Sequence, residues 1–343
     1  MKTKRLLILA SAFVLMAFFG SHNVNAIECV RALLPPALDA LASDSAVAFS
    51  TVTVDSWDGS TPAPADDNIY YAFEPKKTVA TVGFIILPGG NCDPRSYAPA
   101  AHAIAAKGFF TCIIPVPNCV ATSGYLRADR IISDYGKIRK WVIGGHSIGG
   151  TAAGFYALQS NNISGVVIWA SFMDEAHRLD NTALKVLSVT GSLDGRATPE
   201  LVNEYSIYLP ADTVFVKIEG GNHTQFGWID PYPLPYLSQD NAATITIEEQ
   251  QEIIVRATAD FLKQFNQSIC PVVYLLGKED PRVKTVRKFR DELLAKSSSG
   301  RDIVELYKKR SSQLIEIFEN SPVIKNAVRM VLGAIIPVIE LLL

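Results

Sequence analysis

The chain has 343 residues, of which 48% are hydrophobic and 19% are charged, and its formal net charge is −2. This composition supports one large or two smaller globular domains with a substantial core. It excludes a disordered chain and a strongly basic nucleic-acid-binding protein, so we expect no nucleic-acid partner.

Residues 1–26 have the organisation of a secretory signal peptide. A basic start precedes an apolar run over 6–19, and the segment ends Val-Asn-Ala, with a small residue at the expected cleavage point. A membrane anchor is the alternative, but the run is shorter than the roughly 20 residues that span a bilayer. We therefore expect cleavage after Ala26 and a secreted or periplasmic protein.

The cysteines all follow this segment, and their number is odd. They are Cys29, Cys92, Cys112, Cys119 and Cys270. Export permits disulfides, but an odd number leaves at least one thiol outside any intramolecular pair. Cys112 and Cys119 flank a proline-containing loop and could meet across it, although the sequence fixes no pairing. The chain has neither a C-x-x-C motif nor a His/Cys cluster, so we expect no metal and no cofactor.

From residue 27 to 269 the chain alternates β-prone and helical stretches. Two short β-prone runs at 49–57 and 69–73 suggest an opening antiparallel pair. Apolar runs then predict buried strands at 79–87, 109–116, 141–143, 165–170, 184–190 and 214–218. Helices are expected over 96–107, over 123–139 and after residue 147. This alternation predicts an α/β fold with a mostly parallel sheet, helices on both faces and chemistry at the carboxyl ends of the strands.

Residues 145–149 read Gly-His-Ser-Ile-Gly, a G-x-S-x-G pentapeptide between an apolar run and a stretch of small residues. A nucleophile on a strained strand-to-helix turn needs neighbours with almost no side chain, so that the turn can close. A glycine-rich loop capped by a helix is the alternative. The strand before the motif and the small-residue helix after it favour Ser147 as a nucleophile.

Two more polar residues directly follow predicted strands. Asp194 lies in the turn after 184–190, and His223 lies in the loop after 214–218. Alone, Asp194 could be an ordinary turn former and His223 a loop imidazole. Together with Ser147 they occur in the order nucleophile, acid, base that this architecture uses. We therefore predict a triad in which His223 takes the proton of Ser147 and Asp194 orients the imidazole.

An oxyanion formed at Ser147 would need hydrogen-bond donors. The backbone N–H of Ile148 at the helix start is one candidate, and that of Gly90, in the turn after the strand at 79–87, is the other. A plain chain reversal over 88–90 is the alternative for the second.

Four separated stretches resemble the bacterial α/β-hydrolase family, in particular its small fold-5 branch. They are L-P-G-G-N-C-D-P-R-S-Y over 87–97, W-V-I-G-G-H-S-I-G-G over 141–150, G-S-L-D-G-R-A-T-P-E over 191–200 and I-E-G-G-N-H-T-Q-F-G-W over 218–228. The resemblance implies an eight-stranded, mostly parallel sheet and a Ser-Asp-His hydrolase, which carries onto Ser147, Asp194 and His223. It favours a small-molecule carboxylic ester as the substrate. The sequence departs from the family at Pro88, where many members have His.

The charge changes sign near residue 270. Residues 27–269 hold 16 Lys and Arg against 25 Asp and Glu, whereas residues 270–343 hold 13 against 9. This shift indicates a boundary between a hydrolase domain over 27–269 and a basic helical domain over 270–343. The second region resembles the Cys-initiated C-terminal domains of exported bacterial proteins through a few scattered positions. These are Cys270, Gly277, Pro281, Phe289, Arg290, Asp291, Gly300 and Arg301.

Three helices are expected in this C-terminal region. One carries an apolar stripe made by Val283, Val286, Phe289, Leu293 and Leu294, a second covers 301–319, and a third runs from 323 to the end. The last is apolar over 330–343 but contains Pro337 and Glu340. We therefore favour a docked or interfacial helix over a transmembrane one, and a peripheral envelope or membrane contact or a partner site as its role.

The sequence thus predicts a secreted or periplasmic serine hydrolase that cleaves carboxylic esters through an acyl-enzyme. The alternative is a non-catalytic binding protein that keeps the hydrolase fold while its basic tail works at the cell envelope. An aromatic wall around Trp228, Tyr232 and Tyr236 would line the substrate site, unless this segment is only a proline-stiffened surface loop.

Overall fold

The computed structural model describes residues 32–60, 68–230, 240–265, 270–277 and 279–343. The predicted signal peptide over 1–26 lies outside these residues and stays a prediction.

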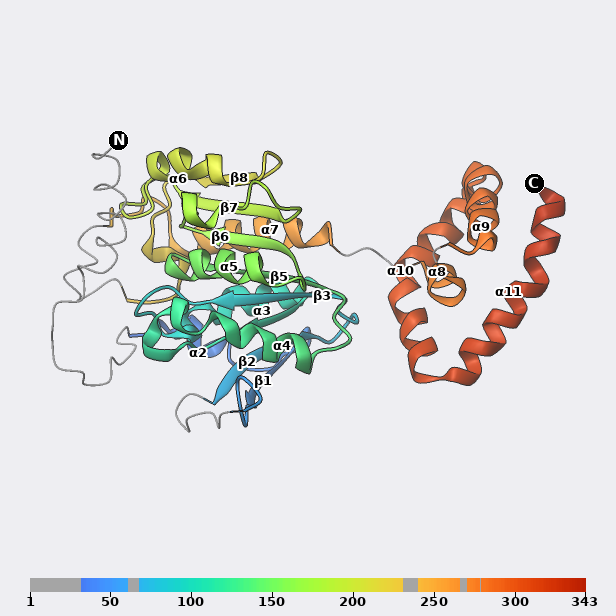
Figure 1. The fold of residues 1–343 in the computed structure, drawn as a ribbon, viewed down its shortest axis with the longest axis horizontal. Coiled ribbons are helices and arrows are strands. Elements are labelled where there is room, and N and C mark those ends of the chain that lie inside the picture. The colour runs from blue at the N-terminus through green and yellow to red at the C-terminus, as the bar shows by residue number, and fades with distance from the viewer. Residues whose placement is uncertain (1–31, 61–67, 231–239, 266–269, 278) are drawn as a thin grey trace.

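The centre of the fold is an eight-stranded sheet with the order β1-β2-β4-β3-β5-β6-β7-β8 (Figure 1). The strands are β1 (Val47–Thr53), β2 (Ile69–Pro75), β3 (Val82–Leu87), β4 (Phe110–Ile113), β5 (Lys140–His146), β6 (Ile163–Trp169), β7 (Lys185–Gly191) and β8 (Val214–Ile218). β2 pairs antiparallel with β1 and with β4, whereas all the other neighbours pair in parallel. The predicted mostly parallel sheet and its opening antiparallel pair are confirmed.

Helices cover both faces of this sheet (Figure 1). The helices of this part of the chain are α2 (Pro35–Asp39), α3 (Ala98–Ala106), α4 (Ala128–Asp134), α5 (Ile148–Gln159), α6 (Pro199–Tyr205) and α7 (Ile247–Lys263). Along β3, Phe84 and Ile86 pack with residues of α3 and α7, and Ile85 and Leu87 pack with residues of α4 and α5. Because every β3 residue is buried, the strand reads as a continuous apolar run rather than an alternating one.

The helix expected over 123–139 is shorter in the structure. A 3-10 turn over Tyr125–Arg127 leads into α4, which ends at Asp134. Tyr135 leaves helical geometry at φ −111° and ψ 57°, and the exposed Gly136 follows in a turn. The helix thus ends before the predicted boundary at 139, and β5 begins at Lys140.

The cysteines correct one possibility raised by the sequence. Cys119 is in a disulfide. Cys112 is not its partner, because Cys112 lies fully buried in β4 as a free thiol. Burial also raises the pKa of the Cys112 thiol well above its usual range.

The C-terminal region is helical, as the sequence predicts. Its helices are α8 (Pro271–Leu276), α9 (Pro281–Glu292), α10 (Ser298–Asn320) and α11 (Pro322–Leu342), drawn in orange to red in Figure 1. The expected apolar stripe is only partly covered, since Val283 on α9 is buried but Leu293, just past the end of α9, is 41% exposed. Within the described residues, α11 is the one helix whose length and composition would allow it to cross a membrane.

Candidate active site

Ser147 occupies a sharp turn between β5 and α5. Its backbone has φ 53° and ψ −126°, a conformation that residues other than glycine rarely adopt. The Ser147 N–H donates to the carbonyl oxygen of Trp169 at 2.8 Å, which fixes the turn to β6. A Cβ atom on Gly145 or Gly149 would overlap the carbonyl oxygen of Leu87. The two glycines of the pentapeptide therefore allow the turn to pack directly against the end of β3.

Asp194 and His223 are in direct contact. Nδ1 of His223 lies 2.9 Å from Oδ2 and 3.1 Å from Oδ1 of Asp194, and both side chains are buried. Oδ1 of Asp194 also accepts from the amides of Arg196 and Ala197, each at 2.8 Å. These bonds hold the carboxylate behind the imidazole, and they leave Nε2 of His223 as the nitrogen available for chemistry.

The turn after β3 lies beside the start of α5. A Cβ atom on Gly90 would lie 3.4 Å from Cγ2 of Ile148, so Gly90 lies against the Ile148 side chain. The Gly89 amide is engaged, because it donates to the hydroxyl of Tyr97 at 3.0 Å. Ile148 is the first residue of α5, where amides lack intrahelical acceptors and the helix dipole favours negative charge. The structure thus brings together the two segments that carry the predicted oxyanion donors.

His146, which precedes Ser147, is a residue whose contribution the sequence does not reveal. The buried imidazole packs against the ring of His223, with 4.5 Å between the ring centroids. It also stacks on Phe226, and its Nδ1 lies 2.9 Å from the hydroxyl of Tyr97. His146 and Tyr97 therefore connect the turn at Gly89 with the imidazole of His223. No local pattern in the sequence signals this contact.

Helix α7 holds the loop that carries His223. Gln250 is fully buried, and its amide group donates to the carbonyl oxygen of Asn222 at 2.8 Å and accepts from the Asn222 amide at 2.9 Å. The neighbouring Gln251 donates to the carbonyl oxygen of Gln225 at 2.7 Å. The backbone is thus fixed on both sides of His223. A glutamine on the apolar face of a helix was the available signal in the sequence.

A second carboxylate, that of Asp240, ties the acid turn to the base loop. Its Oδ1 accepts from the amides of Gly195 at 3.1 Å and His223 at 3.2 Å. Its Oδ2 accepts from the amide and hydroxyl groups of Thr224 at 2.8 and 2.6 Å. Asp240 thus links the backbones next to both Asp194 and His223. The sequence does not indicate this role, because these contacts exist only after folding.

The expected aromatic wall is only partly among the residues that the structure describes. Trp228 is buried rather than open to a substrate, and the rest of the expected aromatic wall, including Tyr232 and Tyr236, lies outside the described residues.

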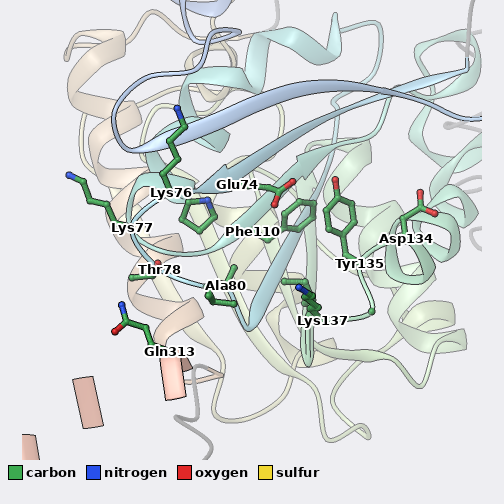
Figure 2. A pocket seen from close by; sticks show the side chains of 14 residues that line it. Glu74, Lys76, Lys77, Thr78, Ala80, Phe110, Asp134, Tyr135, Lys137 and Gln313 are labelled. Atoms are coloured by element: carbon green, nitrogen blue, oxygen red, sulfur yellow. The ribbon is translucent and has the colours of Figure 1, made fainter. Parts of the chain in front are cut away.

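A cavity of about 540 Å³ opens at the other end of the sheet, where Ala80 precedes β3, Phe110 begins β4 and Ile138 precedes β5 (Figure 2). It lies at the amino ends of the strands and does not contain Ser147, Asp194 or His223. Among the described residues, no three His, Cys, Asp or Glu side chains gather as metal ligands would.

Comparisons with known proteins place this chain in a family. No curated protein matches the chain in sequence. One similar solved structure is the esterase domain of a Rhodothermus marinus protein, 13% identical, with a TM-score of 0.48; the match covers 63% of this chain and 99% of that one. The model of the alpha/beta hydrolase family matches residues 83–252, which span the sheet from β3 onward and all the candidate site residues. The chain therefore belongs to the α/β-hydrolase family.

Proposed function

We propose that this protein is a serine hydrolase that cleaves a carboxylic ester through an acyl-enzyme, with Ser147 as nucleophile, His223 as base and Asp194 as orienting acid. Family membership supports hydrolase activity in general. The observation that carries the finer proposal is the buried Asp194–His223 contact of 2.9 Å, in which the His223 ring packs on His146, the residue before the strained turn at Ser147. A loop imidazole with only a structural role would not need a buried carboxylate fixed by two further backbone amides.

The proposed steps follow from the protonation of these groups. Nε2 of His223 takes the Ser147 proton as the hydroxyl oxygen attacks the ester carbonyl carbon, and the Asp194 carboxylate stabilises the imidazolium. The carbon–oxygen bond to the alcohol then breaks, and the alcohol leaves with the proton from His223. Water attacks the acyl-Ser147 ester with His223 again as base, releasing the carboxylic acid. Amides at Gly90 and Ile148 would stabilise each oxyanion, by roughly 3 kcal/mol per donor.

We also propose that the protein is exported. The N-terminal pattern supports this, and so does the disulfide at Cys119, because such bonds persist in oxidising compartments. Cell fractionation checks the proposal: a protein that stays in the cytosol with its first 26 residues attached would contradict it.

Labelling with a fluorophosphonate probe tests the proposed activity. The wild-type chain should become labelled at Ser147, and Ser147→Ala should lose the label. His223→Ala should react far more slowly, because Ser147 then lacks its base. A folded wild-type protein that resists the probe, or that becomes labelled equally after Ser147→Ala, would favour the non-catalytic binding protein instead.

A further inference from the structure

The charged side chains of the helix α11 contact the other C-terminal helices, while many of its apolar side chains face solvent. Lys325 lies over the ring of Tyr274, with Nζ 4.7 Å from the centroid. Arg329 donates from Nε to the carbonyl oxygen of Leu275 at 2.9 Å. Both partners belong to α8. Near the other end of α11, Glu340 accepts from the hydroxyl of Thr285 on α9 at 3.1 Å.

The opposite side of α11 is apolar and exposed. We call it the outer face; at 3.6 residues per turn, its members share one side of the helix. They are Val323, Met330, Val331, Val338, Leu341 and Leu342, which are 55–87% exposed. Ile336, on the same side as the three charged residues, is buried. The helix thus has apolar residues on both sides, and the apolar residues of the outer face are left exposed to solvent. In Figure 1 α11 forms the outer edge of the C-terminal helices.

A basic helix, α9, packs against α11 on the side that carries Glu340. α9 contacts α11 through Thr285 and carries Lys284, Arg287 and Lys288 in exposed positions. Their spacing of three and four residues places these cations on one side of α9. Exposed apolar side chains on one helix, with exposed cations on the helix packed against it, are a combination that binds the interface of an anionic lipid bilayer.

We propose that the outer face of α11 docks this protein onto the surface of an anionic membrane, with Lys284, Arg287 and Lys288 contacting lipid head groups. The helix is long enough to span a bilayer. A lengthwise span would withdraw Lys325, Arg329 and Glu340 from their partners on α8 and α9 and carry charge into hydrocarbon. If α11 instead lies in the plane of the interface, its outer face is buried in the membrane, and the contacts of Lys325, Arg329 and Glu340 with α8 and α9 are kept. This inference does not depend on the proposed chemistry, because none of these residues belongs to the candidate active site.

Vesicle co-sedimentation of the full chain tests the proposal. Vesicles of phosphatidylcholine with phosphatidylglycerol should bind the protein, more weakly at high salt, and vesicles of phosphatidylcholine alone should bind it much less. The double variant Met330→Gln/Leu341→Gln should bind roughly tenfold more weakly or worse, since it removes two exposed apolar side chains. Helix propensity is nearly unchanged. The matched control is Ile207→Gln, which replaces a 67% exposed apolar residue of the hydrolase domain and should bind as wild type.

A second experiment tests the charges with a triple variant in which Lys284, Arg287 and Lys288 are replaced with Gln. The replacement should lower affinity for the anionic vesicles roughly fivefold for each charge and leave binding to phosphatidylcholine unchanged. All variants share the same N-terminus, so their differences report on the C-terminal helices. Three outcomes would overturn the proposal: full binding by the double variant, protein that alkaline carbonate cannot extract, or a solution dimer that Met330→Gln/Leu341→Gln converts to monomer.

Discussion

Gln250 binds both backbone groups of Asn222, the residue immediately before His223. Its side-chain nitrogen donates to the Asn222 carbonyl at 2.8 Å, and its side-chain oxygen accepts from the Asn222 amide at 2.9 Å. Through this pair α7, which packs on the sheet, fixes the end of the loop from which the imidazole projects. The position of His223 therefore depends on a helix that begins after the loop has ended.

Gln250→Leu should lower turnover roughly 10- to 100-fold, because His223 loses its fixed position relative to Ser147. It should also lower the free energy of unfolding by about 2–5 kcal/mol, since the buried Asn222 groups lose both partners. Ester hydrolysis and urea unfolding measure the two effects. Gln264→Leu is the control, because the Gln264 side chain donates to the Phe261 carbonyl at the end of α7 and contacts no candidate site residue among those described, so turnover should be unchanged. Equal turnover in the two variants would show that the loop holds its own shape.

Asp240→Ala should lower kcat roughly tenfold or more with little change in KM. Four donors on the acid turn and the base loop lose their shared acceptor, and no direct contact with a substrate is removed. Asp240→Asn should lose less, since one oxygen can still accept. Steady-state kinetics on a soluble ester checks the order. The control is Asp212→Asn, which removes an exposed ion pair with Lys185 and should change neither constant. A rise in KM alone would assign Asp240 to substrate binding.

The strained turn at Ser147 predicts opposite effects on stability and activity. A φ of 53° with ψ of −126° is unfavourable for any residue with a Cβ atom and is open to glycine. Ser147→Gly should therefore be about 1 kcal/mol more stable than Ser147→Ala, after the entropic cost of glycine is allowed for, while both variants lose ester hydrolysis. Chemical denaturation of the two variants measures the difference. If Ser147→Ala were the more stable variant, the turn would not be strained.

The sequence predicts those parts of the site that depend on local pattern. Ser147, Asp194 and His223 each directly follow an apolar strand, and parallel strands bring their carboxyl ends to one edge of the sheet. Gln250, Asp240 and His146 act through contacts between segments far apart in the chain, which periodicity does not report. The sequence does contain one indication for Gln250, because this polar residue shares the buried face of α7 with Ile254 and Thr258. No sequence pattern indicates the contacts of Asp240 or His146.

Gly149→Ala tests the close packing of α5 against the end of β3. The added methyl group would overlap the carbonyl oxygen of Leu87 and lie 2.6 Å from that of Pro88. Both contacts are backbone atoms that cannot rotate away, so we expect a loss of about 3 kcal/mol or more in unfolding free energy. Turnover should fall as well, since the same shift moves the turn at Gly90 away from Ile148. Thermal unfolding and ester hydrolysis measure the two effects.

Gly136→Ala is the matched control, because an added methyl group there meets nothing within 4 Å. The control should be neutral or slightly stabilising, through the lower entropy of its unfolded chain. A Gly149→Ala protein as stable and active as Gly136→Ala would mean that α5 can move off the sheet without cost, and the packing argument for the pentapeptide would then fail.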